Sequence, residues 1–439
     1  MTKDMTSGST LRHIINFAVP LCMGMLFQQL YSMVDTMIVG KVLGVQPLAG
    51  VGATGSLNFM IIWFCLGICN GFSIPIAQAF GANKEVELRR YVANSTWLCV
   101  FFSIVITFFV CIFTRNMLVL LKTPEDIFEY AYIYILIIFL GIPCTFLYNF
   151  LAGVARALGD SKTPLMFLIL SSVMNIVLDF ILMIPIPLGV AGAAIATVIS
   201  QGVSGVICLL YMKKKFPILK ANPDEWRMRG NYMKRLCAIG VPMGLQYSIT
   251  AIGSLVITAA VNVLGATAVA GVTAAQKINN LITCPLESLG QTMAPYTGQN
   301  IGAGKKERVS DGVKKASICG FVWSAICIPI VLLFGKPMTL LFLSEPNAEV
   351  VNYSFLFLLV STLGYCLLTL VGTVRFSIQG MGYSGFAMTA GVLEMTARTI
   401  AGVVLAPLMG YMGICLSNVL AWIFADAFLL PAFRHCIKK

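Results

Sequence analysis

The chain has 439 residues, of which 58% are hydrophobic and only 11% are charged. Soluble domains average about half apolar and about a quarter charged residues, so a water-soluble globular protein is excluded and most of the surface must face lipid. We interpret the formal net charge of +12 as a signal of membrane topology and not of nucleic-acid binding.

Twelve apolar runs are long enough to cross a bilayer, which takes roughly 20 residues each. In chain order they cover residues 14–39, 47–77, 92–113, 128–151, 164–186, 189–211, 233–261, 268–298, 316–335, 351–375, 386–407 and 410–433. The first run carries Pro20 and Asp35 and leads into further helices, so we expect a retained spanning helix and not a removable signal peptide. The expected fold class is all-α integral membrane with twelve transmembrane helices.

Basic residues are distributed unevenly between the short loops. One set of loops holds Lys84, Arg89, Arg90, Arg156, Lys162, Lys213, Lys214, Lys215, Lys220, Arg227, Arg229, Lys305, Lys306, Arg308, Lys314 and Lys315. The opposite set holds only Lys41, Arg115, Lys122 and Lys336. An excess of Lys and Arg marks the cytoplasmic side, so both chain termini are expected in the cytoplasm.

The two halves of the sequence repeat one plan. VPLCMGMLFQQ at 19–29 resembles VPMGLQYSITA at 241–251, VLGVQPLAGVGA at 42–53 resembles VLGATAVAGVTA at 263–274, and QAFGANKE at 78–85 resembles QNIGAGKK at 299–306. GVARALGDSK at 153–162 resembles FSIQGMGYSG at 376–385 more weakly, as GVAGAAIA at 189–196 resembles GYMGICLS at 410–417.

Six crossings in each half insert both halves in the same direction, so we expect two six-helix bundles related by a pseudo-twofold axis along the membrane normal. The expected domains are an N-terminal lobe over 1–212, a cytoplasmic linker over 213–232 and a C-terminal lobe over 233–439. A cleft between two such lobes suits a carrier with alternating access better than a fixed pore.

Pro20 and Pro242 stand at equivalent points in the first helix of each half, where each removes a backbone hydrogen bond. They are expected to bend these helices and to act as hinges, although a static kink fits equally well. The fourteen cysteines are scattered mostly through apolar runs without a CxxC pair, which is typical of packing residues. Only two histidines occur, His13 and His435, so neither a histidine metal site nor a Ser-His-Asp enzyme is expected, and no cofactor.

Ionisable residues at bilayer depth cost at least about 2.5–3.5 kcal/mol each and are therefore the best functional markers. The candidates are Asp35, Asp179, Glu287, Glu394, Asp426, Lys277 and Arg398. Glu394 and Arg398 are four residues apart on one helix face, which predicts a structural ion pair. Asp426 is interpreted as a polar packing or end-of-helix residue. Gln28, Tyr31, Lys277 and Glu287 are candidates for a substrate cleft.

The surroundings of Asp179 predict a cation-coupling site. Asn175 precedes Asp179 by one helical turn, and the next helix offers Ala193 and Thr197, again one turn apart. A carboxylate, an amide oxygen, a hydroxyl and a main-chain carbonyl are hard oxygen donors, which alkali and alkaline-earth cations select, and Asp35 could add a second carboxylate.

Na+ at Asp35, Asn175, Asp179 and Thr197 is therefore one candidate occupant of this site. A proton is the other, because two acids close together in a low dielectric do not both stay ionised at low cost. A purely structural bridge between helices, held by hydrogen bonds, is the alternative that these residue types also allow.

Five segments resemble the bacterial multidrug and toxic-compound extrusion (MATE) family. They are FQQLYSMVDTMIVGKVLG at 27–44, LAGVGA at 48–53, RALGDSKTP at 156–164, NIVLDFIL at 175–182 and GQNIGAGK at 298–305. The resemblance covers nearly the whole chain. It implies a secondary antiporter of the bacterial inner membrane that exports small organic compounds, often amphipathic and cationic, in exchange for Na+ or H+. It further implies a monomer in the lipid bilayer with no nucleic-acid partner.

The same resemblance implies an N-lobe cation site. The family's pattern of an acid in the first helix, Asn-x-x-x-Asp in the fifth, and Ala and Thr in the sixth reads here as Asp35, Asn175, Asp179, Ala193 and Thr197. The seventh predicted helix around 241–261 and the tenth around 351–375 contain no acid. Coupling through a C-lobe acid on either of those helices is therefore not expected.

A lipid-linked precursor flippase of the same superfamily is the alternative function. Such proteins often carry extra helices and several basic residues that hold a pyrophosphate, and here only Lys277 and Arg398 are candidates. A channel is disfavoured by the duplicated lobes and by the lack of a pore-loop signature.

Overall fold

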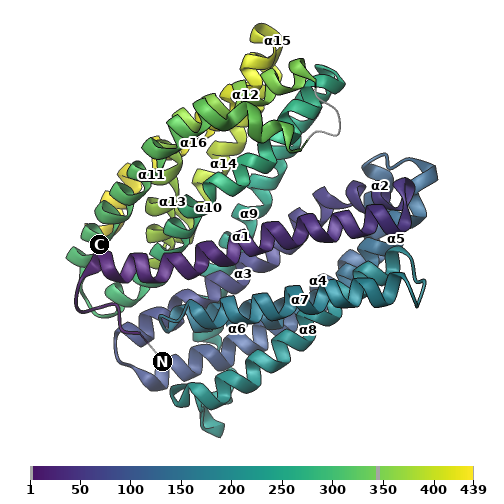
Figure 1. Cartoon of the computed structure of the whole chain (residues 1–439). Coiled ribbons are helices and arrows are strands. Elements are labelled where there is room, and N and C mark those ends of the chain that lie inside the picture. The colour runs from purple at the N-terminus through teal and green to yellow at the C-terminus, as the bar shows by residue number, and fades with distance from the viewer. Residues whose placement is uncertain (1–2, 343–346, 439) are drawn as a thin grey trace. The chain divides into compact units, whose positions relative to one another are not determined.

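The computed structural model of the chain describes residues 3–342 and 347–438, and every regular element in these ranges is helical. The first half contains α1 (Thr10–Leu43), α2 (Val45–Ala53), α3 (Gly55–Gly81), α4 (Glu85–Leu120), α5 (Glu125–Leu140), α6 (Ile142–Ala157), α7 (Lys162–Met183), α8 (Val190–Lys215) and the short 3₁₀ helices η1 (Pro217–Leu219) and η2 (Pro223–Trp226). The second half contains α9 (Gly230–Val263), α10 (Ala266–Gly302), α11 (Lys306–Leu340), α12 (Ala348–Leu363), α13 (Tyr365–Gly380), α14 (Ser384–Ile400), the π-helix η3 (Ala401–Leu405), α15 (Ala406–Met409) and α16 (Tyr411–Lys438) (Figure 1).

Within the described ranges, nine helical stretches are long and apolar enough to cross a membrane. Two further spans arise if each bent pair is one crossing: α5 with α6, bent by 48°, and α12 with α13, bent by 52°. The 37-residue α10 coincides with the predicted run at 268–298, but Lys277, Glu287 and many small polar residues leave it outside this set. The predicted run at 47–77 corresponds to α2 and α3, which are interrupted at Thr54.

The repeat seen in the sequence is also present in the backbone. Several glycines adopt a positive φ, a region where other residues are strained, and three of those in the first half have a counterpart in the second half. The pairs are Gly44 with Gly265 (φ 89° and 94°), Gly159 with Gly382 (81° and 93°) and Gly189 with Gly410 (60° and 59°). The bends between α5 and α6 and between α12 and α13 also fall at a glycine in each half, Gly141 and Gly364. The two halves therefore turn at the same places.

The chain forms two compact units whose boundaries lie inside helices. Unit 1 consists of Met1–Asp4 and Met23–Gly244, and unit 2 of Met5–Cys22 and Leu245–Lys439. The expected boundaries at 212 and 233 follow the hydropathy, whereas the compact units divide within α1 and within α9. Hydropathy marks where a helix leaves the membrane, but it carries no signal for the point at which a continuous helix changes its packing partners.

In unit 1, the first turns of α9 pack directly against α3. A Cβ atom on Gly71 would lie 2.4 Å from the Gly240 Cα, and one on Gly67 would lie 2.6 Å from the Gly244 Cα. Such short distances leave no room for a side chain, so the two backbones touch. Each helix has two glycines four residues apart at this contact. Their close packing explains why this part of α9 belongs to unit 1.

In unit 2, the segment before and within the first turns of α1 packs against α10. Met5, Ile14 and Phe17 are almost fully buried in a cluster that also contains Met293 and Tyr296. The backbone before α1 is fixed as well, because the Met5 amide donates to Gln299 Oε1 (2.9 Å). Apolar burial of this kind assigns the beginning of α1 to unit 2.

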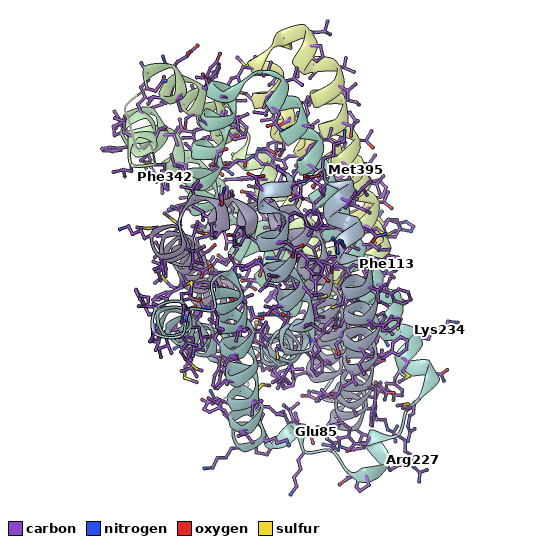
Figure 2. The ribbon with its side chains drawn as sticks, turned by 90° about the vertical axis from the view of Figure 1, so that its right-hand side faces the viewer. Glu85, Phe113, Arg227, Lys234, Phe342 and Met395 are labelled. Carbon is purple, nitrogen blue, oxygen red and sulfur yellow. The ribbon has the colours of Figure 1, made fainter. Side chains whose placement is uncertain are left out.

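The connector between α8 and α9 covers one end of unit 1. Trp97 Nε1 donates to the Trp226 carbonyl (3.0 Å), and the Arg229 amide donates to Asn94 Oδ1 (2.9 Å). Figure 2 shows Arg227 of this connector and Glu85 toward the same end of unit 1, while Phe113 lies farther along α4. The basic loops of unit 1 are thereby gathered at one end of its helices.

Candidate functional site

The site is built on α7 and α8, which run side by side in unit 1 (Figure 1). Their close approach depends on Gly192, where a Cβ atom would lie 2.8 Å from the Leu182 carbonyl oxygen. On α7, Asn175 and Asp179 occupy the same buried face and are 1% and 0% exposed. One turn separates them, as the sequence predicts.

Hydrogen bonds join α7 to α8 at this face. Asn175 Nδ2 donates to Thr197 Oγ1 (3.3 Å), and Thr197 Oγ1 in turn donates to the Ala193 carbonyl (3.1 Å). Ala193 itself is buried. The structure thus places Asn175, Asp179, Ala193 and Thr197 in one cluster, where their backbone and side-chain oxygens lie within reach of one another.

Asp35 of α1 completes the cluster from the part of α1 that belongs to unit 1. Its carboxyl group lies within electrostatic range of that of Asp179. When both are ionised, two negative charges face each other in a medium of low dielectric, and the repulsion must be relieved by something bound between or beside them.

Four side-chain oxygens of this cluster have no hydrogen-bond donor among the described residues. They are Asp35 Oδ1, Asn175 Oδ1, Asp179 Oδ1 and Asp179 Oδ2. An unpaired buried acceptor costs about 1–3 kcal/mol, and more when it is charged. Two carboxylates, an amide oxygen and a nearby main-chain carbonyl therefore form a donor set that fits a small cation or a proton.

A transition-metal centre has no support in the part of the chain that the structure describes, where no group of three or more His, Cys, Asp or Glu side chains could hold a metal ion. The cluster offers only hard oxygen ligands. Hard cations with flexible coordination, or a proton, match such a set better than a metal that prefers nitrogen or sulfur.

Two tyrosines border the acid pair. Tyr31 of α1 and Tyr134 of α5 both lie within electrostatic range of Asp35 and Asp179. Tyr31 was expected only as a substrate-cleft candidate, and sequence reasoning missed Tyr134, which is 9% exposed. The sequence gives little indication of it, because α5 contains three alternating tyrosines. Of these, only Tyr134 is buried.

No hydrogen bond or ion pair links the other cleft candidates to this cluster among the described residues. Gln28 is an exposed residue of α1. Lys277 and Glu287 are exposed residues of α10 in unit 2, and the Lys277 ammonium lies 6.0 Å from the centre of the Phe342 ring. Their role in substrate binding stays a prediction.

Unit 2 contains a charged cluster of a different kind. Arg398 Nη1 lies 3.8 Å from Glu394 Oε2, which is the pair predicted from their spacing. Sequence reasoning missed Arg375 of α13, whose guanidinium donates to the other Glu394 oxygen. The contact joins residues 19 apart on different helices, so no spacing rule could reveal it.

The proposed hinge prolines lie inside unbroken helices. Pro20 is within α1 and Pro242 is within α9, and both helices continue through them. Each proline stands within one turn of the residue at which its helix passes from one unit to the other. Their role as hinges stays a prediction.

Long apolar helices, a duplicated plan and an acid pair with oxygens that lack hydrogen-bond donors among the described residues are the features of a multi-span membrane transporter. The family model described as MatE matches residues 20–181 and 242–408. The chain therefore belongs to the MATE family, whose members are ion-coupled antiporters, and it is a transporter and not an enzyme.

Curated relatives agree with this assignment. The chain is 30% identical over 355 residues to "Probable multidrug resistance protein YpnP" of Bacillus subtilis, covering 80% of this chain and 79% of that protein. It is 29% identical over 363 residues to "Probable multidrug resistance protein YoeA" of the same organism, covering 81% and 78%. The matched region thus spans about four fifths of this chain and of each bacterial relative.

A solved structure confirms the fold class. The crystal structure of a MATE protein in complex with MaL6 superposes with a TM-score of 0.92 at 21% sequence identity, covering 100% of both chains. The predicted all-helical, multi-span membrane fold is therefore correct.

Proposed function

We propose that this protein is a secondary antiporter that exports small organic compounds, often amphipathic and cationic, in exchange for Na+ or H+. The observation that carries the proposal is the buried cluster of Asp35, Asn175 and Asp179, with four oxygens that lack a donor among the described residues. The names of the relatives, which describe multidrug resistance proteins, support drug-like substrates.

The chemistry of the site supports coupling by charge neutralisation. A cation or proton that enters from outside the cell relieves the repulsion between Asp35 and Asp179 and gives their oxygens a partner. Its release toward the cytoplasm restores the repulsion. Because the two forms of the site differ in free energy, binding can bias an equilibrium between outward-open and inward-open states, which is the requirement for exchange transport.

The proposal includes the topology expected from the loops. The basic loops of unit 1 lie at the end covered by the α8–α9 connector, and we assign this end to the cytoplasm of a bacterium. The two repeats then form lobes around a pseudo-twofold axis, acting as a monomer. Both termini belong on the cytoplasmic side, although residues 1, 2 and 439 themselves lie outside the described residues.

The test is gradient-driven efflux from proteoliposomes. A sodium gradient and a pH gradient are imposed separately, and export of a fluorescent organic cation is followed for the wild type, Asp35→Asn and Asp179→Asn. We expect one gradient to drive efflux and both substitutions to abolish it. Asp224→Asn, which changes an exposed aspartate of the connector, is the matched control and should transport normally.

Two outcomes would overturn the proposal. Gradient-driven efflux that survives both substitutions would exclude the N-lobe site. Translocation of a lipid-linked precursor without dye efflux would instead support a flippase, although Arg398, one of its two candidate basic residues, is already paired with Glu394.

A further inference from the structure

A second buried cluster of charges, in unit 2, has no part in the proposed cation cycle. It consists of Arg375 on α13, Glu394 and Arg398 on α14, and Asp426 on α16. Their exposed fractions are 8%, 3%, 8% and 5%, so all four are buried. Glu394 is the centre of the cluster, because one of its oxygens accepts from Arg375 and the other faces Arg398.

Asp426 is the member that lacks a direct partner. It lies within electrostatic range of Arg375 and Glu394. Neither of its carboxyl oxygens, however, has a hydrogen-bond donor among the described residues. Buried carboxylates are normally paired, so this one requires a ligand or a proton.

A polar layer adjoins the charged one. Gln379 follows Arg375 by one turn on α13, and its Nε2 donates to Gln246 Oε1 on α9 (2.5 Å). Gly391, three residues before Glu394, would place a Cβ atom 3.2 Å from Gln246. In this layer Gln379 Oε1 is another acceptor without a donor in the described part of the chain.

The unpaired atoms are mainly acceptors, and this identifies the missing occupant. Asp426 contributes two and Gln379 one, against two unpaired donors, Arg375 Nε and Arg398 Nη1. A metal cation would be repelled by the two guanidinium groups, and an anion by the two carboxylates. A single proton adds the missing donor without adding bulk. We propose that Asp426 is a proton-binding site of this transporter, in a unit separate from the Asp35–Asp179 pair.

The charges around Asp426 allow a proton to bind and to leave. Arg375 carries a positive charge and Glu394 a negative one, and both lie within electrostatic range of Asp426. Of the elements packed against α16, α13 contributes Arg375 and α14 contributes Glu394 and Arg398, while η3 and α15 contain no ionisable residue. α12 holds Glu349 in its exposed first turn, and the charged residues of α16 itself lie more than two turns beyond Asp426, in its last turns.

The internal repeat also favours a proton over Na+ in unit 2. Extended at the same offset, the repeat of residues 153–162 at 376–385 pairs Arg398 with Asn175. Where unit 1 has an amide oxygen that can bind a cation, unit 2 thus has a permanent positive charge of its own. A resident guanidinium excludes a metal ion from that position but leaves the nearby carboxyl group able to take up a proton.

Infrared difference spectroscopy of the purified full-length protein tests this directly. Spectra are recorded while the pH is changed, and the C=O band of a protonated carboxylic acid is followed. We expect one such band to disappear in Asp426→Asn, to persist with a shift in Asp426→Glu, and to persist unchanged in the double variant Asp35→Asn/Asp179→Asn. Ser417→Ala, at another buried position of α16, is the matched control.

Thermal unfolding separates proton binding from a merely structural role. Asp426→Asn keeps the shape of the side chain and should unfold close to the wild-type temperature, whereas Glu394→Gln leaves two buried arginines without a full counter-charge and should unfold much earlier. If no carboxylic-acid band is lost in Asp426→Asn and none shifts in Asp426→Glu, the proposal is wrong, and bridging water satisfies Asp426. The spectroscopic result does not depend on which ion drives transport through unit 1.

Discussion

The side chain of Asp179 is unfavourable for folding, and in the proposed function it is necessary for transport. It is fully buried, and neither of its oxygens has a donor within the described residues. An uncompensated buried charge of this kind destabilises the folded state. The cost is recovered only when a cation or proton is bound.

This predicts opposite effects of Asp179→Asn on stability and on ligand response. Without a coupling ion, the variant should be more stable than the wild type by about 1–3 kcal/mol, because the unpaired charge is removed. If Na+ is the coupling ion, saturating Na+ should stabilise the wild type by about 2.7 kcal/mol at roughly 100 times Kd, and the variant not at all. Thermal unfolding in detergent with Na+ or K+ measures both. Equal Na+ stabilisation of wild type and variant would contradict the assignment.

Sequence reasoning succeeded at the residue scale where the signal is local. The spacing of Asn175 and Asp179, and of Ala193 and Thr197, follows from helical periodicity, and the structure brings all four together. It failed where a contact depends on the packing of distant helices. Arg375 is the last residue of the predicted run at 351–375 and was not among the candidate ionisable residues. Its hydrogen bond to Glu394 exists because α13 and α14 are neighbours.

At the scale of the elements, the contact between α3 and α9 depends on the absence of side chains. Gly67 and Gly71 on one helix face Gly244 and Gly240 on the other at distances that exclude a Cβ atom. These are backbone neighbours, which cannot move aside as the end of a flexible side chain can. The contact therefore fixes the first turns of α9 within unit 1.

Gly71→Ala should destabilise the protein by about 1–3 kcal/mol, because overpacking forces the two backbones apart. Its matched control is Gly52→Ala in α2, where a Cβ atom would meet nothing within 4 Å, and where alanine should be neutral or slightly stabilising in a helix. The unfolding temperatures of the two purified variants provide the comparison. Equal temperatures would show that the α3–α9 contact adapts at little cost.

The connector between α8 and α9 provides a pH-dependent contact at the proposed cytoplasmic surface. Arg89 Nε donates to Glu225 Oε2 (2.9 Å), and the Asn222 amide donates to the same oxygen (2.7 Å). The hydrogen bond from Arg89 is the main reason that the pKa of Glu225 lies below its ordinary value of 4.5. Because the folded pKa is depressed, the contact stabilises the connector above about pH 4.5 and is lost as the pH falls through the folded value.

We therefore expect acid to release the connector before the helices unfold. Proteolysis between α8 and α9 should increase below about pH 4.5 in the wild type. In Glu225→Gln the same cleavage should already occur at neutral pH, with a loss of about 1 kcal/mol in local stability. A protease that is active in acid, with cleavage sites identified by mass spectrometry, measures this. Cleavage that does not change with pH in either protein would refute the role of the pair.

For the whole molecule, the duplicated plan and the all-helical, multi-span fold class could be predicted from the sequence. The predicted number of twelve crossings is not reached, because by length and composition the described residues contain nine spans, or up to eleven with the two bent pairs. Hydropathy and repeated motifs are properties of short segments, so they can be recognised without knowing how the helices pack. The division of the chain within α1 and α9 could not be predicted, because it depends on which neighbour each turn of a continuous helix contacts. The predicted run at 268–298 is long enough to cross a membrane, but α10, which contains it, is less apolar than the helices that qualify as spans.

The division predicts how separated halves will behave. Residues 1–220 contain the beginning of α1 but lack the first turns of α9, and residues 221–439 have the opposite deficit. Each half alone should aggregate or be degraded, since it exposes the glycine face of α3 or the apolar cluster around Tyr296. Co-expressed halves should recover a stable complex that purifies through a tag on either one. Stable halves that do not associate would be inconsistent with this division.

Helix α1 belongs to unit 2 at its beginning and to unit 1 from Met23 onward, so it connects the two units mechanically. Asp35 and the buried residues Ile14 and Phe17 belong to the same uninterrupted helix, one in the ion site and the others in the core of unit 2. A displacement of Asp35 can therefore be transmitted to unit 2 through the continuous helix α1. Pro20 lies in α1 between Phe17 and Asp35, so we expect the stiffness of this helical turn to determine how much of a displacement at Asp35 reaches unit 2.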